Sequence, residues 1–120
     1  IVISGAPAPT GFDNTTNAWA DNRYIAGMRA AGAANYVDCI GVHHNSGATS
    51  PTVSTGHPAG SHYSWYYQPM VDLYYNTFGG ARQLCFTELG YLSGEGFSAL
   101  PPNFAWAAGT SVQELSLIHI

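Results

Sequence analysis

Short apolar runs alternate along the chain with longer stretches in which apolar residues recur at helical spacing. Segments rich in Gly, Pro and Ser separate them, and these residues favour turns and loops. A short apolar run is typical of a buried strand, whereas a stripe with a period near 3.6 residues predicts a helix. The pattern predicts strands over Ile1–Ala6, Tyr36–His43 and Arg82–Glu88, and helices before Gly32, over Trp65–Phe78 and from Thr110 onward.

The predicted elements alternate between strand and helix, and the longer loops follow the strands. Two of these loops, His44–Tyr63 and Leu89–Gly109, are long. Such alternation is typical of a parallel sheet with right-handed crossovers, in which loops at the carboxyl ends of the strands hold the chemistry. The sequence therefore predicts an α/β fold with about three parallel strands and intervening helices. Three strands are too few to close a barrel of eight.

Charge narrows the range of functions. Charged residues make up only 8% of the 120 residues, and three Lys and Arg against seven Asp and Glu give a formal net charge of −4. Nucleic-acid binding needs a basic surface to meet phosphates, so that class is excluded. No apolar run approaches the roughly 20 residues that span a bilayer, which excludes a membrane-spanning segment. The shortage of charge also indicates that some apolar surface packs against further polypeptide.

The two cysteines, Cys39 and Cys85, each lie inside an apolar strand-like run. Two cysteines do not make a disulfide framework. Cysteine in such surroundings behaves as a small buried hydrophobic residue. The sequence therefore favours two buried free thiols, with a disulfide between them as the less favoured alternative.

The strongest local feature is the segment F-T-E-L-G-Y, residues 86–91. It places Glu88 at the end of a predicted strand, on the functional edge of a parallel α/β sheet. Glycoside hydrolysis needs two carboxylates, because one protonates the leaving oxygen while the other attacks the anomeric carbon or activates water. Sugars also stack on aromatic faces, and the chain contains eight Tyr and three Trp. Glu88 is therefore the candidate catalytic carboxylate.

Three segments resemble the clan A glycoside hydrolases, retaining enzymes on (β/α)8 (TIM) barrels. Thr87–Tyr91 is similar to the T-E-x-G-[WY] setting of their nucleophile, a Glu at the end of strand seven. Asp38–His44 resembles strand six, where a D-x-x-G-x-H run brings a His or an aromatic residue to the sugar. Ile1–Gly11 resembles strand five and its loop. The resemblance implies a partial TIM barrel over residues 1–114, a C-terminal-half fragment of a catalytic domain with Glu88 as nucleophile.

The resemblance also implies that the acid/base residue lies outside this chain. In this clan the acid/base Glu follows an Asn at the end of strand four, and no Asn-Glu pair occurs in this chain. The implied function is retaining hydrolysis of O-glycosidic bonds in an oligo- or polysaccharide, without a cofactor, by a fragment that is inactive alone. The alternatives are a non-catalytic carbohydrate-binding barrel and an unrelated metal-dependent α/β hydrolase. Localisation and oligomeric state stay open, a secreted bacterial protein being one option.

Several residues near the predicted strand ends are candidates for substrate binding, and His43 is a stronger candidate than His44 because adjacent strand residues point to opposite faces. The candidates are His43, His44, Tyr63, Tyr91 and Trp106. A metal site formed by His43, His44, His57 and His62 is disfavoured, since the chain has no compact H-x-x-x-H or Cys-His spacing.

The end of the chain combines a helix start with an unusual tail. Capping boxes occur in two registers, Thr110 with Gln113 and Ser111 with Glu114, and predict that a helix begins there. The tail over residues 115–120, L-S-L-I-H-I, matches the translation of a common sequencing-library adapter, so we expect it to be non-native. The alternative is a genuine continuation of the helix, although its apolar residues do not keep to one helical face.

Overall fold

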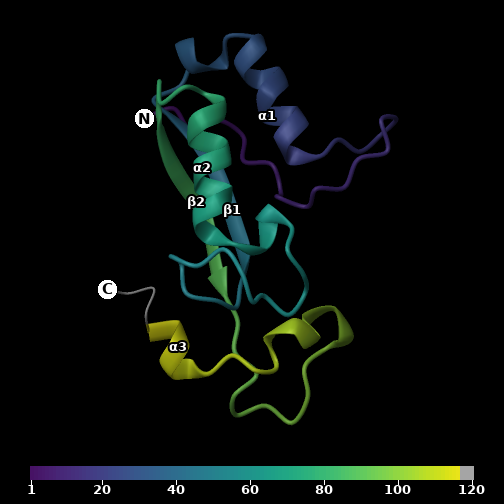
Figure 1. The fold of residues 1–120 in the computed structure, drawn as a ribbon. Helices are drawn as coiled ribbons and strands as arrows, with labels where there is room; N and C mark the ends of the chain where they lie inside the picture. The colour runs from purple at the N-terminus through teal and green to yellow at the C-terminus, as the bar shows by residue number, and fades with distance from the viewer. Residues whose placement is uncertain (117–120) are drawn as a thin grey trace.

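The computed structural model describes residues 1–116, which form a small α/β domain. Two parallel strands, β1 (Cys39–Gly47) and β2 (Gln83–Tyr91), are joined through helix α2 (Tyr67–Thr77), which lies along the strands in Figure 1. Helix α1 (Asp21–Ala30) precedes β1, and the short helix α3 (Val112–Ser116) follows β2. Short 3-10 helices, η1 to η3, cover Ala33–Asn35, Tyr63–Trp65 and Pro102–Ala107. From α1 onward, the order of the elements agrees with the predicted alternation.

The first predicted strand does not form as a regular strand. Residues 1–6 run parallel to β1 but make a single bridge, between Ile3 and Cys39. The segment is exposed rather than buried, with Ile1 102% and Val2 56% accessible. Within residues 1–116 no strand pairs with its outer edge, so these side chains have little to pack against. The described residues therefore form a two-stranded sheet and not the three strands of a partial TIM barrel.

The core lies between the sheet and the helices. Ile40 and Val42, two residues apart on β1, point toward α2, as strand alternation requires. Met70, Tyr74 and Phe78 follow one another at intervals of four residues and form the matching stripe along α2. The core comprises Ile25, Ile40, Val42, Met70, Tyr74 and Phe78. Pro69 lies in the first turn of α2, where its missing N–H costs no helical hydrogen bond.

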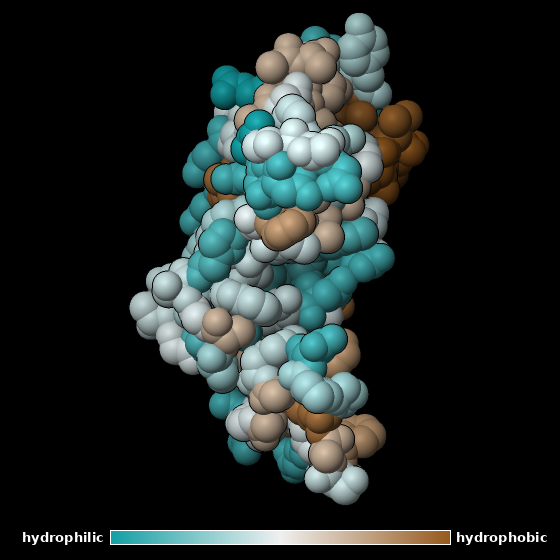
Figure 2. Space-filling model, turned by 90° about the vertical axis from the view of Figure 1, so that its right-hand side faces the viewer, coloured by the Kyte–Doolittle hydropathy of each residue, from teal (hydrophilic) through white to brown (hydrophobic). Residues whose placement is uncertain are grey.

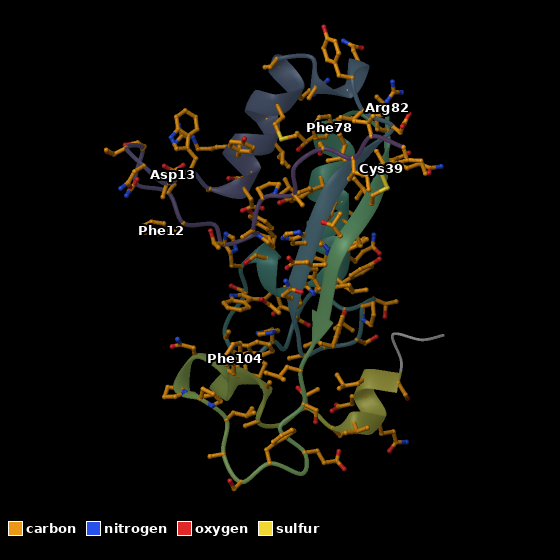
Figure 3. All side chains as sticks on the ribbon, turned by 180° about the vertical axis from the view of Figure 1, so that it is seen from behind. Phe12, Asp13, Cys39, Phe78, Arg82 and Phe104 are labelled. Atoms are coloured by element: carbon orange, nitrogen blue, oxygen red, sulfur yellow. A yellow bond between two sulfur atoms is a disulfide. The ribbon has the colours of Figure 1, made fainter. Side chains whose placement is uncertain are left out.

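The other face of the sheet is open. Figure 3 shows no helix over this face within the described residues, and it shows the sulfur atoms at Cys39. Cys39 forms a disulfide with Cys85, and their Cα atoms are 5.8 Å apart. The prediction of two free thiols is therefore wrong. The physical reason is the parallel register, which pairs Cys85 with Gly41, two residues beyond Cys39, and so brings both thiols to one face within bridging distance.

A bulge interrupts the pairing of the two strands just before the candidate carboxylate. Val42 pairs with Phe86, but the next residue of β1, His43, pairs with Glu88, so Thr87 is an extra residue in β2. Bulges of this kind redirect the side chains that follow them. Phe86 packs against the core, and strict alternation would send Glu88 to the same side. The bulge places the carboxylate on the open face instead.

Both strands end later than the pattern predicts. β1 begins at Cys39 rather than Tyr36 and continues to Gly47, and β2 continues to Tyr91. Polar and glycine residues beyond the apolar runs still pair, because each strand already has a partner whose backbone groups satisfy theirs. The residues around the candidate site therefore belong to strand ends rather than to flexible loops.

One of the two predicted capping boxes forms. The Ser111 backbone N–H donates to Glu114 Oε2 at 2.7 Å, and the Glu114 N–H donates to Ser111 Oγ at 3.1 Å. This reciprocal pair satisfies two backbone donors at the start of α3. Residues 117–120 of the predicted non-native tail lie outside the described residues, so its origin stays a prediction.

Candidate active site

Glu88 lies on the open face of the sheet, near the carboxyl end of β2. Its side chain is 56% exposed, and its Oε2 lies 3.6 Å from His43 Nδ1. The same oxygen accepts a hydrogen bond from Asn45 Nδ2 at 2.7 Å. His43 and Asn45 are two residues apart on β1 and share one face. The structure therefore brings together two of the predicted site residues, Glu88 and His43, and adds Asn45.

Glu88 differs from the other carboxylates in its surroundings. Each of the other six in residues 1–116 has a contact that supports local structure: Asp13 with Arg23, Asp21 with Tyr63 and Tyr74, Asp38 with the Val2 backbone, Asp72 with Gln68, Glu95 with the Val112 backbone and Glu114 with Ser111. None of these six hydrogen-bonds to Glu88, His43 or Asn45 within that range. Glu88 contacts side chains at a strand end and faces solvent, which is the position from which a carboxylate can react.

His44 points to the opposite face from His43. It is fully buried, and its ring lies edge-on to Tyr67 and Tyr91 with centroid distances of 5.8 Å in both cases. Neither ring nitrogen has a hydrogen-bond partner among the described residues. Burial lowers the pKa of His44 to about 4, and the nearby His57 acts in the same direction. His44 is therefore neutral at physiological pH and belongs to the packed side of the sheet.

The buried His44 predicts an acid-sensitive fold. Its folded-state pKa of about 4 lies below the unfolded value of about 6.5, so below pH 6.5 the unfolded chain binds a proton that the folded protein does not. The free energy of unfolding should therefore fall by about 3 kcal/mol as the pH drops from 6.5 to 4. Urea titrations across this range measure the loss.

A matched pair of variants isolates this effect. His44→Phe should weaken the pH dependence, because it removes the fully buried group that resists protonation. The contribution of His57, whose pKa is also lowered by burial, remains. His62→Phe, at an exposed position, should keep it. An unchanged slope in His44→Phe would contradict the assignment to His44.

Tyr91 ends β2 with its ring directly over Gly47. A Cβ atom at Gly47 would come within 2.3 Å of the Tyr91 ring, so the contact requires glycine there. Burial raises the pKa of Tyr91 to about 12, with a smaller contribution from Tyr67. Its hydroxyl is therefore protonated at physiological pH and can donate a hydrogen bond.

Trp106 belongs to a group of rings beyond the ends of the strands. His57 stacks on Trp65 with a centroid distance of 4.9 Å, and its ring lies 5.4 Å from that of Trp106. His57 Nε2 is 2.9 Å from the Ser46 carbonyl oxygen, which ties the loop after β1 to the strand end. The loop after β1 thus meets the loop after β2 through these rings. Trp65 and Trp106 are half-buried, so part of this aromatic surface borders solvent.

Tyr63 lies in a different environment from the other candidates. Its hydroxyl donates to Asp21 Oδ1 at 2.6 Å, and the Tyr74 hydroxyl donates to Asp21 Oδ2 at 3.0 Å. Burial, followed by the hydrogen bond to Asp21, raises the pKa of Tyr63 above its ordinary value. This buried network links α1, η2 and α2, and it occupies the Tyr63 hydroxyl.

Sequence reasoning missed Asn45. The alternation of strand faces carries the necessary signal, since Asn45 lies two residues after His43 and so shares its face. The predicted strand ends at His43, however, which assigns Asn45 to a loop where alternation has no meaning. The partnership with Glu88 further depends on the bulge at Thr87, which no periodicity in the sequence indicates.

Other surface features lie apart from Glu88. A groove of about 860 Å³ runs between residues 5–12 and α1, and its lining includes the exposed aromatic residues Phe12, Trp19 and Tyr24 but not Glu88. Figure 2 shows hydrophobic residues scattered among polar ones on one side of the molecule, with one strongly hydrophobic patch at the right-hand edge of its upper half. Residues 1–116 contain no cluster of three or more His, Cys, Asp or Glu able to hold a metal ion.

Comparisons of the chain with protein-family models, with curated proteins and with solved structures give no match. No helix in the part of the chain that the structure describes is long and apolar enough to cross a membrane.

Proposed function

We propose that this chain forms part of a retaining glycoside hydrolase that cleaves O-glycosidic bonds in an oligo- or polysaccharide, with Glu88 as nucleophile. The observation that carries the proposal is the setting of Glu88. Its carboxylate is exposed at a strand end, and one of its oxygens is held by Asn45 at 2.7 Å with His43 at 3.6 Å. A carboxylate held in this way by a side-chain amide has a defined orientation toward the substrate.

The proposed reaction has two steps. A Glu88 oxygen attacks the anomeric carbon, the glycosidic C–O bond breaks, and the leaving oxygen takes a proton from a general acid. Water then attacks the same carbon, the ester bond to Glu88 breaks, and the former acid accepts the proton from water. Two inversions at one carbon give net retention of configuration.

The second carboxylate is proposed to come from polypeptide outside these 120 residues. The six other carboxylates of residues 1–116 hold structural contacts, and the clan that the sequence resembles takes its acid/base Glu from a different strand. The same proposal extends to the fold: the α/β layer would be part of a TIM barrel. The open sheet face and the unpaired outer edge of residues 1–6 support this extension, since parallel sheets in proteins are covered on both faces.

The substrate is proposed to lie across the carboxyl ends of the strands. His43 would contact the sugar beside Glu88, while Tyr91 and Trp106 would supply a hydroxyl donor and an aromatic surface. Tyr63 and His44 contribute less under this proposal, because Asp21 occupies the Tyr63 hydroxyl and His44 packs on the other face.

Covalent trapping tests the proposal. A 2-deoxy-2-fluoro glycoside with a dinitrophenolate leaving group should label the complete natural polypeptide at Glu88. The fluorine slows both formation and hydrolysis of the ester, whereas the activated leaving group speeds formation alone, so the ester accumulates. Mass spectrometry of peptides locates the label, and NMR of the first-formed sugar should show retention. Glu88→Gln serves as the unlabelled control. Inversion, or a label on another carboxylate, contradicts the proposal, and sugar binding without any label supports the non-catalytic alternative.

A further inference from the structure

We propose that Asn45 is a positioning residue that selects which oxygen of Glu88 attacks the sugar; this inference rests on the proposed function. The Asn45 Nδ2 atom donates to Glu88 Oε2 at 2.7 Å. The direction of this bond is fixed by chemistry, since an ionised carboxylate only accepts and the amide nitrogen only donates. Hydrogen bonds to ionised acceptors are short and strong, and this one joins the two strands at the site.

The two oxygens of Glu88 have different surroundings. Oε2 is held by Asn45 and faces His43 Nδ1 at 3.6 Å. Among residues 1–116 no group donates a hydrogen bond to Oε1. Formation of a glycosyl ester needs one carboxylate oxygen with a free lone pair, aimed at the anomeric carbon, while the rest of the group stays still. The geometry assigns Oε1 to the attack and Oε2 to the anchor.

Asn45 suits this role better than a charged residue would. Its amide is uncharged and does not exchange a proton with the carboxylate, so the hydrogen bond orients Glu88 without adding a charge beside it. His43 lies farther from the same oxygen, outside hydrogen-bond distance. Asn45 is therefore the residue that fixes the orientation of the carboxylate.

Gly90 makes room for this arrangement. A Cβ atom at residue 90 would lie 2.9 Å from Asn45 Oδ1 and 3.4 Å from Asn45 Cα. The first distance is shorter than real Cβ contacts, so a side chain at residue 90 would displace the amide. The bulge at Thr87 brings the carboxylate to the same face. Asn45, the space left by Gly90 and the bulge at Thr87 together determine the position of Glu88 Oε2.

The test uses the complete natural polypeptide and a dinitrophenyl glycoside, whose leaving group needs no proton, so that kcat/KM reports on attack by Glu88 without help from the general acid. Asn45→Ala should lower kcat about 10- to 100-fold, as expected for loss of a hydrogen bond to a charged group, with KM changed only a few-fold. Asn45→Asp keeps the shape but adds a second carboxylate beside Oε2. It should shift the acidic limb of the kcat/KM profile upward by about one pH unit or more.

The controls separate positioning from folding and from the proposed function itself. Asn76→Ala and Asn76→Asp, at an exposed residue near the end of α2, should leave both kcat and the acidic limb unchanged. A purely structural role for Asn45 would lower the stability of Asn45→Ala but leave its kcat unchanged under conditions where the variant is folded. Wild-type kcat in Asn45→Ala, or an unshifted limb in Asn45→Asp, while Glu88→Gln is inactive, overturns the positioning role and leaves the hydrolase proposal standing. Activity in Glu88→Gln overturns the hydrolase proposal instead.

Discussion

Replacing Glu88 by Gln in the complete natural polypeptide should lower kcat/KM for glycoside hydrolysis by at least about 10⁴-fold, the loss typical of removing a reacting group. Gln has the same shape and can still bond to Asn45, but its amide does not form a glycosyl ester. Substrate binding should change little, because the cleft keeps its size and its neighbours. Steady-state kinetics with an aryl glycoside and calorimetry with the sugar measure the two quantities.

Two companion variants sharpen this result. Glu95→Gln, in the loop after β2, should stay within a few-fold of wild type, since its carboxylate caps a helix start rather than the strand ends. Glu88→Ala should regain turnover of a dinitrophenyl glycoside when azide is added. Azide would attack the anomeric carbon as the phenolate leaves, and the glycosyl azide would have inverted configuration. Full activity of Glu88→Gln would refute the assignment.

Loss of the Cys39–Cys85 disulfide should lower the free energy of unfolding by about 4 kcal/mol. The bond joins residues 46 positions apart, and closing a loop of that length in the unfolded chain removes about this much conformational freedom. Urea unfolding of Cys39→Ala/Cys85→Ala, compared with wild type under oxidising conditions, measures the difference. Such bonds persist in oxidising compartments.

A reductant provides the internal control. Dithiothreitol should bring wild type down to the stability of the double variant and leave the double variant itself unchanged. Thiol counting establishes that the bond has opened. Fully reduced wild type that keeps its original midpoint would mean that the disulfide does not stabilise the fold.

The arrangement of the elements could largely be predicted from sequence. Apolar runs around Val42 and Phe86 read correctly as neighbouring strands, and Gly79 correctly follows the intervening helix. These features are local, because an apolar run and the turn residues that end it can be read within one segment, whatever its partner. The segment of residues 1–6 has the same β-branched character, yet it pairs at one point only. Its composition reports a preference for extended backbone, whereas strand formation also needs partners on its edges.

The features of the candidate site also fall into two groups: those that local sequence predicts and those that depend on how the two strands pair. The strand-end position of Glu88 follows from where an apolar run stops, and the opposite facing of His43 and His44 follows from strand alternation. The disulfide and the Asn45 contact depend on which residues of two separate strands stand opposite each other. Register is a property of the pair, so reading each strand alone predicted free thiols.

The bulge at Thr87 has a consequence for anyone who would transplant this site. Before the bulge, Phe86 points toward the helix layer and packs on the core. After the bulge, the alternation of side chains is shifted, so that Glu88 lies on the open face. Copying Phe86 and Glu88 at their present spacing into a regularly paired strand of a designed protein would turn the carboxylate inward, among packed apolar side chains. Burial of an unpaired charge is costly enough to unfold a small domain or to neutralise the acid. Glu88 can therefore be transferred to another protein only together with the bulge at Thr87.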